Sequence, residues 1–189
     1  MSEATVPHLN LSSYPGGGKT TILKILLSQY RAILIPKITT RPKRLNENGC
    51  TEYIYVSEDE FSQRESAGHF LGIEPILVGG EVYHHAIPKI EHWPAVPDKT
   101  NLILSVFGIK AELVKELVLN YKLCFIGFKN KDILKKRLFA RCLVDGGNFE
   151  EKWVIVEQYM SQSIENNYDY IVYNDGTPEE CIAQIRKIL

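Results

Sequence analysis

Eight consecutive residues near the start of the chain could bind phosphate. They read Ser13-Tyr14-Pro15-Gly16-Gly17-Gly18-Lys19-Thr20 and match the pattern G-x-x-x-x-G-K-[ST] except at its first position, where Ser13 replaces glycine. Glycines let successive backbone N–H groups converge on an anion, and a following helix points its positive end at the phosphates. Lys19 would add a mobile charge, and the Thr20 hydroxyl could ligate Mg²⁺. The alternative is a glycine-rich turn with an incidental lysine.

A second basic motif, Thr39-Thr40-Arg41-Pro42-Lys43-Arg44, follows the next strand-like run. Two arginines three residues apart on one loop can hold a phosphate from two sides, because each guanidinium presents a planar fork of donors. A solvated basic loop is the alternative for the charges alone. With the first motif, this one suggests that two phosphorylated ligands bind to the protein.

The composition limits the class of protein. The chain has 189 residues, 44% hydrophobic and 24% charged, with a formal net charge of -1. These values exclude a disordered or fibrous chain and argue against a general nucleic-acid or anionic-membrane binder. The four cysteines are not in CxxC spacing, which argues against a zinc or disulfide framework. No apolar run reaches the ~20 residues that span a bilayer, and the start does not resemble a signal peptide, so we expect a cytoplasmic protein.

Short apolar runs alternate with amphipathic segments along the chain. We expect strands at 6–12, 32–35, 102–107, 123–128 and 170–173, and helices at 20–30, 109–120, 131–142, 149–164 and 177–189. This alternation is typical of βαβ units and a mostly parallel sheet covered by helices on both faces. Between about 53 and 83, strand-like segments surround a short helix at 58–67, which indicates a small inserted subdomain.

Several stretches resemble guanylate kinases. Residues 39–61 are similar to that family's S-T-T-R-x-x-R, glycine and D-Y-x-F-V-S-x-x-x-F; residues 11–23 to L-S-G-P-S-G-x-G-K-S-T-L; residues 134–141 to L-x-x-R-L-x-x-R; and residues 168–175 to F-D-x-x-V-x-N-D. The resemblance covers nearly the whole chain. It implies an α/β fold, a P-loop NTPase-type parallel sheet flanked by helices, in a single domain at 1–189. The core would be 1–37 and 98–189, with an inserted acceptor-binding subdomain at about 38–92 and a helical lid at about 137–155.

The resemblance also implies roles for individual residues, with ATP and Mg²⁺ as cofactors. Lys19, Arg137 and Arg141 would be catalytic, and Thr20 would hold the metal ion. ATP would be bound by Ser13, Tyr14, Pro15, Gly16, Gly17, Gly18, Lys19, Thr20, Thr21, Lys152 and Asn174, and the acceptor by Arg41, Arg44, Tyr53, Glu74 and Tyr83. Lys152 stands where the family commonly has arginine, whose bidentate contact a lysine cannot make. Gly146-Gly147 would give the lid a flexible point.

The chain departs from the family's pattern in three further places. Two residues, Gly72 and Ile73, are inserted before Glu74 if Glu74 is the guanine-reading glutamate; otherwise Glu74 is a surface carboxylate. The family's D-x-D is replaced at Ser105 and Phe107, so the second-shell carboxylate is lacking unless Asp98 or Glu74 takes its place. Lys37 and Ile38 replace the serines that tend to precede T-T-R.

The predicted function is transfer of the ATP γ-phosphoryl group to a small phosphorylated acceptor, with GMP favoured over other nucleoside monophosphates. Two alternatives remain. Bacterial ribose bisphosphate phosphokinases are also similar, since they share the phosphate loop, residues 13–20 here, and the N-D-G ending of residues 174–176, and lack the D-x-D. A guanylate kinase-like binding module without turnover is the other. We expect neither nucleic-acid nor membrane partners, and the oligomeric state is not predicted.

Overall fold

A computed structural model describes residues 8–44, 47, 52–95, 97, 100–105, 113, 115–116, 118 and 120–189. Phe107, Asp98 and most of the helix expected at 109–120 lie outside these ranges. The chain divides into two compact units, one formed by residues 1–33 and 97–189 and the other by residues 34–96. Each unit has its own sheet.

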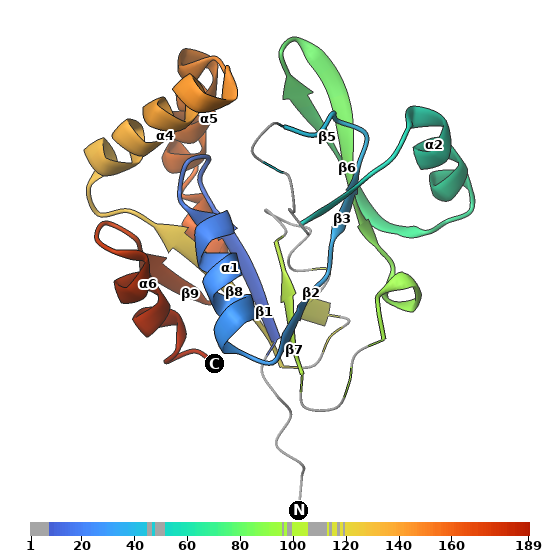
Figure 1. The fold of residues 1–189 in the computed structure, drawn as a ribbon, viewed down its shortest axis with the longest axis horizontal. Helices are drawn as coiled ribbons and strands as arrows, with labels where there is room; N and C mark the ends of the chain where they lie inside the picture. Colours follow the sequence, from blue (N-terminus) through green and yellow to red (C-terminus); the bar gives the residue numbers. More distant parts are fainter. Residues whose placement is uncertain are drawn as a thin grey trace, which may run out of the picture. The chain divides into compact units, whose positions relative to one another are not determined.

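The first unit is built on a five-stranded sheet in the order β2-β7-β1-β8-β9. β1 is parallel to β7 and β8, and β8 is parallel to β9. The elements are β1 (His8–Ser13), α1 (Lys19–Gln29), β2 (Ala32–Leu34), β7 (Asn101–Leu104), β8 (Tyr121–Gly127), α4 (Lys131–Asp145), α5 (Phe149–Ser161), the 3-10 helix η3 (Ile164–Asn167), β9 (Tyr170–Tyr173) and α6 (Pro178–Ile185). α1 packs beside α6, and α4 beside α5 (Figure 1). The α/β class predicted from the sequence is confirmed.

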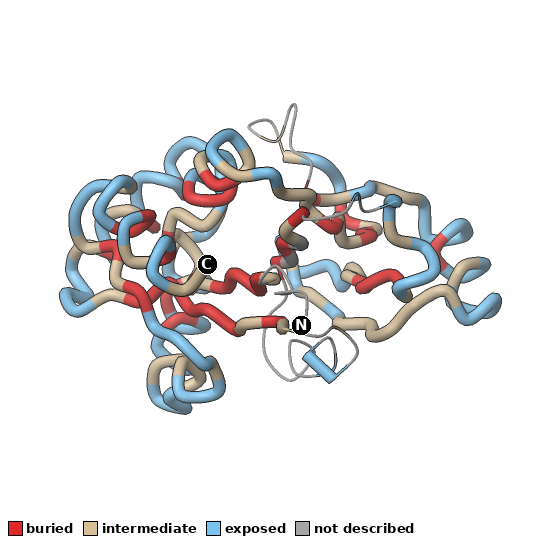
Figure 2. The backbone as a smooth tube through the Cα atoms, turned by 90° about the horizontal axis from the view of Figure 1, so that it is seen from below, coloured by how far each residue is buried: buried red, intermediate tan, exposed pale blue. Residues whose placement is uncertain are grey.

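The central strand β1 carries the phosphate loop at its carboxyl end. Leu9 and Leu11 are fully buried, and the polar Asn10 between them is also buried and donates from Nδ2 to Ser12 Oγ at 3.1 Å. A strand buried on both faces is typical of a covered parallel sheet. Buried residues concentrate in β1 and β8 of this sheet, and Figure 2 shows buried segments of the backbone flanked by exposed ones.

Aromatic and aliphatic side chains join α4 and α5 to the sheet. They form one buried cluster of Tyr14, Phe125, Leu134, Leu138, Cys142, Trp153 and Val156. Leu134, Leu138 and Cys142 recur every four residues on one face of α4, as an amphipathic helix requires. Tyr14 belongs to the phosphate loop, so the loop is part of this core.

The second unit is a four-stranded sheet in the order β4-β3-β6-β5. Its elements are β3 (Lys37–Thr39), β4 (Tyr53–Tyr55), α2 (Glu58–Ser66), β5 (Phe70–Val78), β6 (Glu81–Pro88) and the 3-10 helix η2 (Ile90–His92). β3 runs parallel to β4 and antiparallel to β6, which is antiparallel to β5. Phe61 of α2 packs on Ile38 and Ala86, so α2 covers one face of this sheet.

The ends of three helices differ from the sequence prediction, and α6 ends at Ile185, four residues before its predicted end. α4 continues to Asp145, where Gly146 ends it with φ 68°, a left-handed conformation that glycine adopts without steric cost. α5 ends at Ser161 and is followed by Ser163 with φ 48°. The chain then forms η3 where the sequence predicted that the helix would reach Ile164.

The start of α6 gives a test of local stability. Thr177 Oγ1 accepts from Glu180 N at 3.3 Å, and Glu180 Oε2 accepts from Thr177 N at 3.1 Å, which is a complete capping box. Thr177→Ala should lower the free energy of unfolding by about 1 kcal/mol, because one helix N–H loses its acceptor. Thr177→Ser, which keeps the hydroxyl, should stay close to wild type in urea unfolding. Equal stability of the alanine variant would contradict the role of the cap.

Candidate functional site

The phosphate loop connects the end of β1 to the start of α1. Gly16 has φ 82° and Gly18 has φ 84°, values that side chains with a Cβ rarely adopt. A Cβ on Gly16 would lie 3.0 Å from the Leu138 Cα, and one on Gly17 would lie 2.9 Å from the Tyr14 carbonyl oxygen. The backbone conformation therefore requires glycine at positions 16 and 18. The close neighbours require it at positions 16 and 17.

Ser13 replaces the first glycine of the pattern without backbone strain. It is the last residue of β1 and is not among the described residues with positive φ. Its hydroxyl donates to the Tyr14 carbonyl at 3.1 Å, and Gly17 N donates to the same carbonyl at 2.9 Å. The loop thus closes on the Tyr14 carbonyl although its first glycine is absent.

Asn174 supports the loop from the end of β9. It is 3% exposed, and its Nδ2 donates to the Gly17 carbonyl at 2.9 Å. Its backbone N–H donates to the Gly127 carbonyl at 3.1 Å. The carboxylate of the adjacent Asp175 accepts from the N–H groups of Lys129 and Asn130 at 3.1 and 2.8 Å. The N-D pair therefore ties the phosphate loop to the turn between β8 and α4.

Arg137 lies on α4 and is bound to backbone carbonyls. Its Nη1 donates to Asn174 O at 2.8 Å and its Nη2 to Gly176 O at 2.9 Å. The guanidinium carbon also lies 5.5 Å from the centre of the Phe128 ring. In this state Arg137 fastens α4 to the segment that supports the phosphate loop.

Arg141 and Lys152 lie at the corner between α4 and α5. Arg141 is one helical turn after Arg137, as predicted, and its Nε contacts Asp145 Oδ2 at 3.0 Å. Gly146 ends α4, and Asn148 begins α5 by accepting from the N–H groups of Glu150 and Glu151. The half-buried Lys152 places its ammonium against Gly147, in the space that a Cβ at that position would occupy. Gly146 and Asn148 thus cap the two helices on either side of the predicted flexible point.

Arg41, in the second unit, is almost fully buried and forms an ion pair with Glu47. Its Nη1 and Nη2 donate to the two carboxylate oxygens of Glu47 at 2.8 and 2.7 Å. Burial opposes ionisation of the Glu47 carboxyl, but hydrogen bonds from Arg41, the Arg44 N–H and the Tyr55 hydroxyl outweigh it and lower its pKa from 4.5 to about 2. Burial also opposes the charge on Arg41, and Glu47 nevertheless raises the pKa of the guanidinium.

The Tyr53 ring lies beside two cations, Arg41 and Lys37. The Arg41 guanidinium carbon is 4.7 Å from the Tyr53 ring centre, and Lys37 Nζ is 4.9 Å from it. Arg44 contributes a further charge, 3.5 Å from Glu47, and its side chain is 31% exposed. The structure therefore brings together Arg41, Arg44 and Tyr53, three of the residues predicted to bind the acceptor.

Glu74 lies on the sheet face opposite α2. The register places Tyr55 beside Thr39, Thr39 beside His85, and His85 beside Glu74, and neighbours in register share a face. A register shift between Phe70 and Gly72 accommodates part of the insertion expected before Glu74. Glu74 is thus on the same face as Tyr53, whose ring centre is 5.1 Å from that of His85.

Tyr83 lies close to the turn of the β5–β6 hairpin. Gly79 and Gly80 have φ 61° and 84° between paired Val78 and Glu81, which suits a two-residue turn with two left-handed positions. The Tyr83 hydroxyl donates to the Glu81 carboxylate. That hydrogen bond raises the pKa of the Tyr83 phenol.

Oxygen donors near the loop fit Mg²⁺. Thr20 is the second residue of α1 and is exposed, and the Ser105 hydroxyl is buried with no hydrogen-bond partner in the described part of the chain. Mg²⁺ prefers oxygen ligands and keeps several waters and phosphate oxygens. Within the described ranges, no three His, Cys, Asp or Glu side chains form a preformed metal cage.

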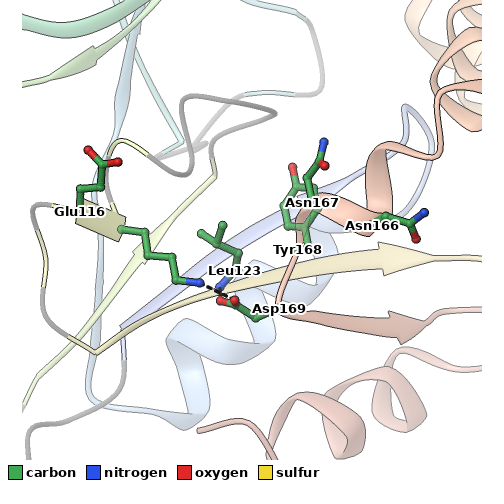
Figure 3. Close-up of a pocket in the computed structure, with 7 residues that line it drawn as sticks. Glu116, Leu123, Asn166, Asn167, Tyr168 and Asp169 are labelled. Atoms are coloured by element: carbon green, nitrogen blue, oxygen red, sulfur yellow. Dashed lines mark hydrogen bonds and ion pairs between the residues drawn. The ribbon is translucent and has the colours of Figure 1, made fainter.

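A pocket of about 610 Å³ lies at the end of the first sheet that is opposite to the phosphate loop. Its lining includes Leu123, near the start of β8, and Tyr168 and Asp169, which immediately precede β9 (Figure 3). Asp169 pairs with Lys115 and accepts from Leu123 N at 2.8 Å. The phosphate loop follows the carboxyl end of β1, parallel to β8, so this pocket is separate from the candidate site.

Sequence reasoning missed two residues that contact the Arg41 side chain or its partner, Glu47 and Tyr55. An acidic residue three positions after Arg44 was a usable signal for Glu47. Tyr55 occupies the phenylalanine position of the family's D-Y-x-F-V-S, and its added hydroxyl donates to Glu47 at 2.8 Å.

Among the described residues, no helix is long and apolar enough to span a membrane.

Comparisons with known proteins agree with the motifs and the geometry. The family model for guanylate kinase matches residues 8–189. The guanylate kinase of Helicobacter pylori is 30% identical over 189 residues, covering 96% of this chain and 86% of that protein. The guanylate kinase of Symbiobacterium thermophilum is 28% identical over 173 residues, covering 91% and 79%. The crystal structure of guanylate kinase from Anaplasma phagocytophilum shares the fold, with a TM-score of 0.66 at 20% identity over 100% of this chain and 87% of that one. Because the family model covers nearly all of the sequence, this chain belongs to the guanylate kinase family.

Proposed function

We propose that this protein transfers the γ-phosphoryl group of ATP to the phosphate of GMP, forming ADP and GDP. The observation that carries the proposal is the phosphate loop, with Lys19 at the start of α1, in a chain that belongs to the guanylate kinase family. The relatives named above are guanylate kinases over nearly the same length. The donor nucleotide is assigned to the first unit and the acceptor to the second.

The donor half works by positioning and charge neutralisation. The N–H groups of Gly18, Lys19 and Thr20, at the amino end of α1, would bind the β and γ phosphates. Lys19 would follow the transferring group, which passes in line between two oxygens without a covalent enzyme intermediate. Thr20 would hold Mg²⁺, which supplies charge neutralisation on the phosphate oxygens.

The acceptor half separates phosphate binding from base recognition. Arg44 and Tyr53 would bind the monophosphate, and Arg41 would support them through its buried pair with Glu47. Glu74 would accept hydrogen bonds from guanine N1–H and its amino group. Those donors are absent from a ribose phosphate, so the position of Glu74 favours the nucleotide over the sugar as acceptor.

The α4–α5 corner would act as the lid. Arg141 and Lys152 would approach the ATP phosphates, and Arg137 would join them by exchanging its carbonyl partners for phosphate oxygens. Closure would exclude water and limit hydrolysis of ATP. We also place the protein in the cytoplasm, where the free buried thiols of Cys124, Cys142 and Cys181 would stay reduced.

A coupled ADP-release assay with ATP and Mg²⁺ tests the proposed acceptor. GMP and dGMP should be phosphorylated, while AMP, CMP, UMP and ribose 1,5-bisphosphate should give at most background rates, because only a guanine presents both donors to Glu74. Glu74→Gln should lower kcat/KM for GMP at least about tenfold, since a charged hydrogen bond contributes roughly 1.5–3 kcal/mol. Turnover with the sugar bisphosphate alone would contradict the proposal.

Lys19 provides the test of the donor half. Lys19→Met should reduce kcat about 100-fold or more, because the positive charge acts on the developing charge of the transferred group. The KM for GMP should stay unchanged. Lys24→Met, an exposed lysine on α1, is the matched control and should keep wild-type activity. Full activity in Lys19→Met would rule out this mechanism.

The Arg41–Glu47 pair predicts a pH dependence of stability. Glu47→Gln should lower the free energy of unfolding by about 3 kcal/mol at pH 7, because it leaves a buried guanidinium without its charge partner. The folded-state pKa of Glu47 is depressed to about 2, so its contribution is complete above pH 4.5 and is lost as pH falls towards 2.

Urea unfolding of wild type and variant at pH 7, 4 and 2.5 measures this difference. The gap between the two proteins should narrow as the pH falls. Glu60→Gln is the control, since Glu60 forms an exposed ion pair with Arg64 and should change stability by less than about 1 kcal/mol. A gap that is constant with pH would show that the charge of Glu47 is not responsible.

A further inference from the structure

Tyr14 places a large aromatic side chain inside the phosphate loop. The family form reads proline at this position, so the ring is a feature of this chain. Tyr14 is 3% exposed, and its ring meets Phe125 of β8 edge to face, with the centres 4.8 Å apart. Phe125 is also in contact with the Tyr168 ring, at 5.0 Å. The side chain is thus packed on all sides, although its backbone belongs to a ligand-binding loop.

The Tyr14 hydroxyl has one specific partner. It donates to Glu165 Oε2 at 2.6 Å, a length typical of a hydrogen bond to a charged acceptor. Glu165 belongs to η3, which follows the left-handed Ser163 at the end of α5. A bond between residues 14 and 165 therefore joins the phosphate loop to the segment that follows the α4–α5 corner.

The backbone of Tyr14 transmits this restraint to the anion-binding groups. Its carbonyl accepts from Gly17 N at 2.9 Å and from Ser13 Oγ at 3.1 Å. Any rotation of Tyr14 would therefore move Gly17 and, with it, the following Gly18 and Lys19, whose N–H groups would bind the phosphates. Asn174 restrains the carbonyl of the same glycine from the other side.

We propose that Glu165 is a positioning residue for the donor nucleotide: through the Tyr14 hydroxyl it holds the phosphate loop in its ligand-binding conformation before ATP arrives. Preorganisation of this kind improves affinity by reducing the ordering that binding requires. The inference rests on the proposed function only for the identity of the nucleotide. It assigns no role to Glu165 at the acceptor.

Equilibrium binding of ATP to the full chain, measured by isothermal titration calorimetry, tests the proposal without requiring turnover. Glu165→Ala and Tyr14→Phe should each weaken ATP binding about tenfold, the loss expected for one hydrogen bond to a charged group. Glu165→Gln should restore most of the affinity, because its amide oxygen still accepts from the hydroxyl. The double variant Tyr14→Phe/Glu165→Ala should bind no more weakly than either single variant.

Acceptor kinetics and a control variant separate a positioning role of Glu165 from general destabilisation of the protein. The KM for GMP should be the same in all variants, and Asn166→Ala, an exposed neighbour in η3, should bind ATP like wild type. Unchanged ATP affinity in Glu165→Ala and Tyr14→Phe would overturn the inference, as would additive losses in the double variant. Wild-type protein that binds ATP but does not phosphorylate GMP would refute the proposed function and leave this comparison of affinities intact.

Discussion

The phosphate loop imposes the strictest constraint on this fold, because its backbone amides must converge in a conformation that an ordinary chain avoids. Gly16 and Gly18 supply the left-handed dihedral angles, and the absence of a Cβ on Gly16 allows the loop to rest on Leu138 of α4. A mobile glycine-rich loop would pay a large entropy cost on binding a ligand. Here the surroundings remove that freedom in advance.

Three parts of the first unit restrain the loop. β1 fixes its start, Asn174 binds the Gly17 carbonyl after β9, and the core of α4 and α5 receives the Tyr14 ring. Arg137 links two of these, since it lies on α4 and donates to the carbonyls of Asn174 and Gly176. Movement of α4 and order in the phosphate loop are therefore coupled through direct contacts.

Local sequence patterns predicted most of the described helices and strands and the positions of the two motifs proposed to bind phosphate, because hydrophobic periodicity and glycine placement are encoded locally. They also placed Glu74 after an insertion, where the structure has a register shift. The tertiary partners were not predictable in this way. Tyr14 and Glu165 are 151 positions apart, and no local pattern indicates that the Arg137 guanidinium binds two carbonyls.

The cost of leaving a buried charge unpaired explains why cations assigned to phosphate binding already have partners in the protein. An unpaired guanidinium that is 2% exposed, as Arg41 is, would be strongly destabilising, so Glu47 holds its charge in place. That bidentate pair is costly to break, whereas the more exposed Arg44 contacts the Glu47 carboxylate at the longer distance of 3.5 Å. Arg141 resembles Arg44, with an exposed guanidinium and a single contact to Asp145. A phosphate dianion can replace the weaker contacts at little cost. Of each pair, the more exposed arginine, Arg44 or Arg141, is therefore the easier one to transfer from its protein partner to a ligand phosphate, and the more fully bonded one, Arg41 or Arg137, is the costlier to detach.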